Sequence, residues 1–109
     1  MVERTIRALG IPWYRREDWD ALLALFVDAE RLLPATYDKW LRRAEQAEKE
    51  FKRQGTIAER VYIDPIEFSL WCVDRGTDLD AAARMNFAAE AVDRKYRNPD
   101  VTGPAVRRR

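Results

Sequence analysis

Apolar residues recur at helical spacing through two segments in the first half of the chain. From Glu17 to Leu33 they fall three or four positions apart, which predicts a helix that Pro34 ends. A second helix is predicted from its N-terminal cap, Thr36, to Gln54, because similar spacing continues there. The apolar positions are Trp19, Leu22, Leu23, Phe26 and Leu33 in the first helix, and Tyr37, Trp40, Leu41, Ala44, Ala47 and Phe51 in the second.

Residues 56–63 largely alternate between apolar and polar side chains, which predicts a β-strand. Asp64 and Pro65 then mark the start of a third helix, since aspartate caps helices and proline suits their first position. Gly76 ends this third helix, and a fourth is predicted within residues 78–96.

The predicted fold is mainly α-helical, of the small α+β class, with four helices and one short strand between the second and third. We divide the chain into an N-terminal arm of undetermined structure at residues 1–16, a single helical domain at 17–96 and a loose basic tail at 97–109. A length of 109 residues suits one domain.

The composition is typical of a folded protein with a heavily charged surface. Hydrophobic residues make up 47% of the chain and charged residues 36%, so the chain is too apolar to be disordered. No apolar run approaches the roughly 20 residues that cross a bilayer, and the start of the chain lacks the apolar core of a secretory signal. The single cysteine permits no internal disulfide. Together these features predict a cytoplasmic protein without membrane contact.

The chain contains no histidine, which removes the commonest general base and the commonest metal ligand. Its four glycines stand far apart, so no glycine-rich phosphate loop is present. Two acidic pairs, Glu45 with Glu48 and Glu90 with Asp93, are interpreted as solvated helix faces because no Glu-x-x-His element accompanies them. We therefore predict no catalytic residue, no metal site and no cofactor, while carboxylate chemistry stays open.

Cys72 is the side chain that raises the question of nucleophilic chemistry. It lies on the same side of the third predicted helix as Phe68 and Trp71. A small thiol beside bulky aromatic residues is typical of core packing, and free cysteine is among the most buried residue types. Arg75 follows about one turn later and would favour a thiolate, but no residue offers a base. Cys72 is interpreted as a packing residue, with a reactive or redox-sensing thiol as the alternative.

The predicted strand lacks a clear partner within the chain, although its backbone donors and acceptors need one. Residues 2–9 alternate only weakly. A second copy would supply the partner if residues 56–63 paired antiparallel with themselves across a two-fold axis. The same contact would cover the spare apolar side of the third helix, which is apolar on two opposite sides. The predicted homodimer interface comprises Val61, Tyr62, Ile63, Ile66, Leu70 and Val73.

Two further groups of residues are candidate contact surfaces. The first precedes the first helix, follows no apolar stripe and combines aromatic with basic side chains. The second lies at the C-terminus and carries positive charge suited to phosphate groups, although such an end is commonly only a solubilising tail. The first group is Trp13, Tyr14, Arg15 and Arg16, and the second is Arg107, Arg108 and Arg109.

Four strings of the sequence carry a resemblance to known proteins: "PWYRREDWDAL", "LPATYDKWL", "VYIDPIEFSLWC" and "ARMNFAAE". Together they resemble a group of small, uncharacterised bacterial proteins that share a strand, an Asp-Pro helix start and a Trp-Cys pair. The resemblance covers residues 12–90 and implies a bacterial, cytoplasmic setting. It implies no activity, cofactor or catalytic residue for this chain.

Three functions are compatible with these features. The leading hypothesis is a small non-catalytic interaction protein, a dimeric helical module that binds another macromolecule, because the third helix has surplus apolar surface and no catalytic set is recognisable. Its partners would be a second copy and another protein. The second is a nucleic-acid-linked regulator, antitoxin-like or repressor-accessory, that would use Arg15, Arg16 and the C-terminal arginines. The third is an enzyme that depends on carboxylates or on Cys72.

Overall fold

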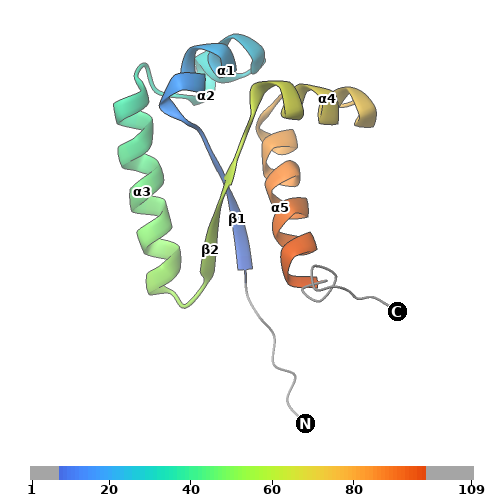
Figure 1. Cartoon of the computed structure of the whole chain (residues 1–109). Helices are drawn as coiled ribbons and strands as arrows, with labels where there is room; N and C mark the ends of the chain where they lie inside the picture. Colours follow the sequence, from blue (N-terminus) through green and yellow to red (C-terminus); the bar gives the residue numbers. More distant parts are fainter. Residues whose placement is uncertain (1–7, 98–109) are drawn as a thin grey trace, which may run out of the picture.

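The computed structural model describes residues 8–97 as a mostly helical fold with a small parallel sheet. Its elements are β1 (Ala8–Trp13), a 3₁₀ helix η1 (Arg16–Asp18), α1 (Trp19–Leu25), α2 (Ala29–Leu32), α3 (Tyr37–Arg53), β2 (Ile57–Tyr62), α4 (Pro65–Arg75) and α5 (Ala81–Arg97). The prediction of four helices and one strand is therefore wrong in number, since the described residues form five α-helices and two strands. Figure 1 shows the strands crossing the centre of the molecule, with α3 on one side and α5 on the other.

The two strands pair in parallel, from Ala8 opposite Ile57 to Trp13 opposite Tyr62. Parallel strands need a crossover connection, and here α3 supplies it, so β1, α3 and β2 form a β–α–β unit. The predicted strand at residues 56–63 is confirmed as β2. The premise that it lacks a partner within the chain is wrong, because the segment expected to be an N-terminal arm contributes β1.

The sequence of β1 hides its strand character because it contains Gly10 and Pro12. Proline donates no hydrogen bond to a ladder, but each strand of a two-stranded sheet has one edge outside the ladder, where proline is tolerated. Gly10 is required by the close approach of α5. A Cβ atom at this position would lie 2.5 Å from the Ala88 carbonyl oxygen and 2.8 Å from Val92 Cγ2.

The first predicted helix is interrupted, because residues 26–28 separate α1 from α2. At this break, two hydrogen bonds to residues distant in the sequence replace the backbone hydrogen bonds of a continuous helix. The Val27 N–H donates to the Leu79 carbonyl oxygen at 3.0 Å, and the Asp28 carboxylate accepts from the Ala81 N–H at 2.8 Å. Apolar spacing predicts which side of a segment is buried, but it does not reveal that the backbone has a competing partner elsewhere.

The helix boundaries that follow agree with the predicted caps. Thr36 accepts a hydrogen bond from the backbone N–H three positions later at 3.2 Å, and so caps α3. Asp64 caps α4 in the same way at 2.9 Å. Asp80, within the residues predicted for the fourth helix, caps α5 at 2.9 Å. Gly55 and Gly76 follow α3 and α4 with φ angles of 87° and 64°, in the left-handed region that glycine adopts without steric cost.

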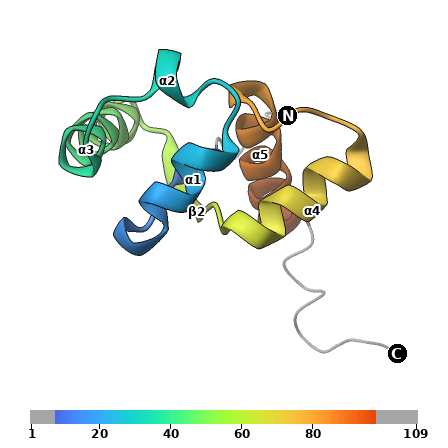
Figure 2. The ribbon, with the colours of Figure 1, turned by 90° about the horizontal axis from the view of Figure 1, so that it is seen from above.

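Aromatic side chains fill the core. The ring centroids of Tyr14 and Trp40 lie 4.7 Å apart where β1 meets α3. Phe68 of α4 contacts Phe26 and Phe87 edge to face, at centroid distances of 5.9 and 5.5 Å. Such aromatic pairs contribute about 0.5–1.5 kcal/mol each beyond the burial of their surface. Seen from above, α1 lies between α3 and α4, over the ends of the two strands (Figure 2).

Candidate interaction surfaces

The two sides of α4 differ sharply in exposure. Its inner side carries Phe68 and Cys72, both fully buried. Its outer side carries Ile66, Leu70 and Val73, whose exposed fractions are 72%, 65% and 74%. Because these three residues are spaced four and three positions apart, they lie in one line along about two turns of the helix. We call Ile66, Leu70 and Val73 the α4 outer face.

The α4 outer face is an apolar line with a polar rim. Helical geometry places Ser69 on one flank and Glu67 with Asp74 on the other, so no charge interrupts the aliphatic residues. Single exposed aliphatic residues are normal on protein surfaces, whereas aligned ones rimmed by polar residues are typical of contact surfaces. Covering one such side chain contributes up to about 1.5–3 kcal/mol, so a partner over all three would gain several kcal/mol.

The strand part of the predicted dimer interface is placed differently. Tyr62 is exposed at the end of β2, and Val61 is half-buried. Ile63 is fully buried within the core, so its side chain has no surface to offer to a second copy. The Arg15 guanidinium covers one face of the Tyr62 ring, 4.3 Å from its centroid. The surface candidates of this group are therefore concentrated on α4.

The interpretation of Cys72 as a packing residue is confirmed by its surroundings. The thiol is fully buried, and its sulfur lies 3.8 Å from the Asp78 carbonyl oxygen. Burial raises the pKa of Cys72, and the nearby carboxylates of Asp80 and Asp78 raise it further. Arg75 does not favour a thiolate here, because its guanidinium donates to Glu90 at 2.9 Å. The Cys72 thiol therefore stays protonated at neutral pH and out of contact with solvent.

The residues expected to form one contact surface before the first helix are divided between core and surface. Trp13, the last residue of β1, and Tyr14, which follows it, are both buried in the aromatic core. Arg15 and Arg16 are exposed, but both lie beside carboxylates. The Arg16 guanidinium donates to Asp38 at 2.7 Å, and that of Arg15 lies 4.0 Å from a carboxylate in η1. The aromatic half of this expected surface is therefore unavailable to a partner.

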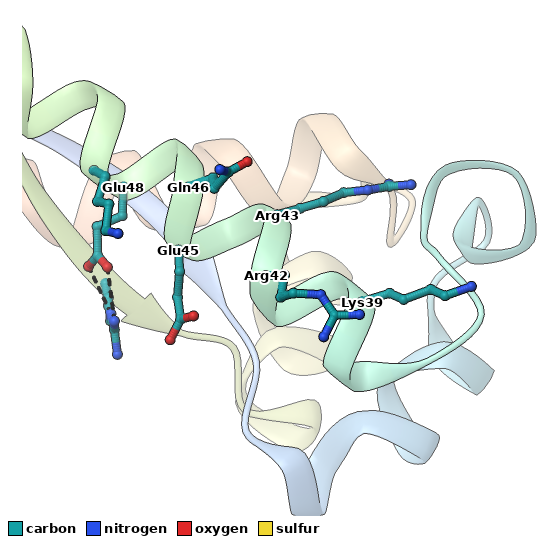
Figure 3. A pocket seen from close by; sticks show the side chains of 8 residues that line it. Lys39, Arg42, Arg43, Glu45, Gln46 and Glu48 are labelled. Carbon is teal, nitrogen blue, oxygen red and sulfur yellow. Dashed lines mark hydrogen bonds and ion pairs between the residues drawn. The ribbon is translucent and has the colours of Figure 1, made fainter.

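A broad surface hollow of about 770 Å³ lies along α3, and sequence reasoning missed it. Figure 3 shows the side chains of Lys39, Arg42 and Arg43 extending in the same direction, toward the N-terminal end of α3. The available sequence signal was the run of basic residues at positions outside the apolar stripe of this helix. The hollow is lined by Lys39, Arg42, Arg43, Glu45, Gln46, Glu48, Lys49 and Arg60.

Two charged residues of this hollow bind each other and attach α3 to β2. The Nε and Nη2 atoms of Arg60 donate to the two Glu48 carboxylate oxygens at 2.8 and 2.9 Å, drawn as dashed lines in Figure 3. The same guanidinium lies over the Trp13 ring, 4.0 Å from its centroid. The hydrogen bonds from Arg60 lower the pKa of Glu48. We call the remaining cations, Lys39, Arg42, Arg43 and Lys49, the α3 basic face.

A buried ion pair, also missed by sequence reasoning, joins the α1–α2 turn to α5. Arg84 Nη1 donates to Asp28 Oδ1 at 2.9 Å, and the guanidinium lies 4.2 Å from the centroid of Phe26. Burial alone would raise the pKa of Asp28, but hydrogen bonds from Arg84 and the Ala81 N–H outweigh burial and lower it. The sequence signal was Arg84 itself, a charge on the apolar side of α5. This pair supports the fold and is closed to solvent.

Two of the acidic residues weighed as metal ligands, Glu48 and Glu90, bind arginines instead. Glu90 accepts hydrogen bonds from Arg75 at 2.9 Å and from the Trp71 indole at 3.3 Å. The bond from Arg75 lowers the pKa of Glu90, so this carboxylate is ionised at neutral pH. Within residues 8–97, no group of three histidine, cysteine, aspartate or glutamate side chains is placed to hold a metal ion.

The sequence matches no family model, and no curated protein or solved structure matches it at a significant level. None of the helices in residues 8–97 is both long and apolar enough to cross a membrane. The C-terminal arginines at 107–109 lie outside the described residues. The features of the described residues that bear on function are therefore two surfaces, the α4 outer face and the α3 basic face.

Proposed function

We propose that this chain is a small interaction protein without a catalytic role, which forms a homodimer through the α4 outer face and binds another macromolecule. The observation that carries the proposal is the alignment of Ile66, Leu70 and Val73, each more than three-fifths exposed, on a helix whose other side is buried. Removing apolar surface from water contributes about 25 cal/mol of favourable free energy per Å². A partner that covers this face would gain that free energy.

A second copy of the chain suits the α4 outer face. A two-fold contact requires a surface that is complementary to itself, and an aliphatic line without charges meets this requirement. Leu70 lies between Ile66 and Val73, so a two-fold axis near Leu70 would place each aliphatic residue against another. Glu67 and Asp74 would stay at the rim in contact with water.

The ionisable groups of the chain support binding better than catalysis. The Cys72 thiol is buried and its pKa is raised, so it supplies no nucleophile at neutral pH. Glu48 and Glu90 each accept hydrogen bonds from an arginine, which lowers their pKa values and makes them poor proton donors near neutral pH.

The dimer is tested by size-exclusion chromatography with light scattering on the full chain. We expect a mass twice that of the 12.8 kDa chain, and a shift toward the monomer for Leu70→Ser. Val27→Ser is the matched control, because Val27 is equally exposed (68%) but lies in the α1–α2 turn, and we expect it to leave the mass unchanged. A monomeric wild type at micromolar concentrations, or equal effects of the two substitutions, would contradict the proposal.

A further inference from the structure

The outward side of α3 carries positive charge that the rest of the described chain does not neutralise. The four cations of the α3 basic face are exposed, and none of their charged side-chain groups forms a hydrogen bond or ion pair with another residue in the range 8–97. Of the nearby acids, Glu48 binds Arg60 and Glu50 binds Arg53, which leaves Glu45 as the acid in the hollow that offsets one of the four positive charges. Acidic residues outnumber basic ones over residues 8–97, so this positive charge is local to α3 rather than a property of the whole surface.

We infer that the α3 basic face binds the phosphate backbone of double-stranded nucleic acid. From Lys39 to Lys49 the cations extend over about 15 Å of helix axis, beside a polymer that carries one negative charge per roughly 1.7 Å. An α-helix of about 10–12 Å diameter also fits a major groove about 12 Å wide. The guanidinium groups of Arg42 and Arg43 suit phosphate oxygens, which they bind in a bidentate manner.

The position of α3 leaves this face open to a large ligand. α3 lies at the edge of the molecule in both views, away from α4 and α5 (Figures 1 and 2). Gln46 lies among the cations, exposed, and its amide can donate to a phosphate or contact a base edge. The helix N-terminus, toward which Lys39 and Arg43 extend, adds the positive end of the helix dipole (Figure 3).

Other polyanionic partners fit this face less well. A helix that lies on a membrane needs large apolar residues beside its basic ones, whereas the apolar residues of α3, such as Trp40 and Leu41, pack against the core. Protein interfaces are anchored by aromatic or aliphatic residues, and the α3 basic face has none. Four cations along one side of a helix, with a neutral amide among them, are best matched by a row of phosphates.

This inference names a partner for the interaction protein proposed above, and so rests on that proposal, but it uses a different surface. The sequence-based hypothesis of a nucleic-acid-linked regulator relied on Arg15 and Arg16, which lie beside carboxylates, and on the C-terminal arginines. The geometry points instead to Arg42 and Arg43, which have no such partners among the described residues. Dimerisation and nucleic-acid binding are therefore measured separately.

The test is fluorescence anisotropy of a labelled 20-base-pair DNA duplex titrated with the full chain at 50 and 200 mM salt. Release of counterions by four cations gives a slope of about −3.6 for log K against log salt, which is a loss of roughly 100-fold over this range. We expect Arg42→Gln/Arg43→Gln to weaken binding at 50 mM salt by about tenfold or more and to make the slope shallower by about 1.8. Circular dichroism checks that this variant is folded.

The matched control is Arg31→Gln/Arg94→Gln, which removes the same charge from exposed positions on α2 and α5. We expect it to change the affinity by less than about twofold, and deletion of residues 107–109 to leave the dependence on Arg42 and Arg43 in place. Equal losses in the two double variants would overturn the inference. So would binding of a poly-glutamate peptide without binding of the duplex, which would assign the face to an acidic protein.

The Leu70→Ser variant separates failure of the two proposals. If Leu70→Ser leaves the mass of the protein unchanged but duplex binding still depends on Arg42 and Arg43, the dimer is wrong and the α3 basic face is supported. If the mass falls as expected but Arg42→Gln/Arg43→Gln binds the duplex like the wild type, the dimer is supported and the nucleic-acid inference is overturned.

Discussion

Helices α3 and α4 are built in the same way but present different chemistry to water. Each begins at a side-chain cap, Thr36 or Asp64, and each is followed by a glycine in the left-handed conformation. Each also turns a buried aromatic residue inward, Trp40 or Phe68. Outward, α3 carries unneutralised cations and α4 carries aliphatic side chains. The buried sides explain why both helices form, while only the outward sides distinguish what they can bind.

The largest expected difference in stability is between a substitution on the buried side of α4 and one on its exposed side. Phe68→Ala removes a fully buried ring at the meeting point of the α1–α2 turn, α4 and α5, and we expect a loss of about 4 kcal/mol in the free energy of unfolding. Leu70→Ala removes a side chain that is 65% exposed, and in the monomer it should change stability by less than about 0.5 kcal/mol. Urea unfolding at low protein concentration measures both. Similar losses would show that the α4 outer face is already covered.

The next effect concerns the buried ion pair that joins the α1–α2 turn to α5. Arg84→Met leaves Asp28 buried without its partner, which should cost about 3 kcal/mol at neutral pH. Because the pKa of Asp28 in the folded wild type is lowered below 3.8, the stability from this pair is present above pH 3.8 and is lost as pH falls through the folded value. The difference between wild type and variant should shrink below pH 3.8, as measured by urea unfolding across pH. A constant difference would contradict this role of Asp28.

The helix caps offer a smaller and symmetrical test. Thr36→Ala and Asp64→Ala each remove one hydrogen bond to the first turn of a helix, and each should cost about 1 kcal/mol. Both caps bind backbone N–H groups and leave the side chains of the outward faces in place, so the dimer mass and duplex affinity should persist where the protein stays folded. Thermal unfolding and light scattering together check this. Loss of dimerisation in Asp64→Ala without loss of helix would show that the cap region itself forms the contact.

The smallest expected effect is on the attachment of α3 to β2. Arg60→Gln removes the two hydrogen bonds to Glu48, but the guanidinium is more than one-third exposed, so we expect a loss of only about 0.5 kcal/mol after solvent screening. The pKa of Glu48 is lowered below 4.5 in the folded state, so this contribution is present above pH 4.5 and is lost as pH falls. Urea unfolding at pH 7 and pH 3 measures it. A loss above 2 kcal/mol would show that α3 depends on this pair.

Local signals in the sequence were sufficient for the helix boundaries after residue 34. Thr36, Asp64, Gly55 and Gly76 each act through bonds and dihedral angles within a few residues, so their effects can be predicted without a structure. Cys72 was also interpretable, because its neighbours on the same helix are bulky and apolar. Helical periodicity likewise separates Ile66, Leu70 and Val73 from the side of α4 that carries Cys72, but their exposure is seen only in the structure.

The features that the sequence did not reveal depend on contacts between distant residues. β1 was missed because Gly10 and Pro12 weaken a strand pattern, and only the approach of α5 explains the glycine. The break after α1 depends on bonds from Val27 and Asp28 to residues more than fifty positions away. For the same reason, the sequence could not show that Arg16 is paired with Asp38 while Arg42 is unpaired among the described residues.

The most direct test of the α4 outer face is methyl nuclear magnetic resonance of the full chain over a dilution series. We expect the methyl signals of Ile66, Leu70 and Val73 to shift together as the dimer dissociates, while the equally exposed Val27 stays constant. Signals of the α4 outer face that do not change from millimolar to micromolar concentration, in a protein with the mass of a monomer throughout, would contradict the account.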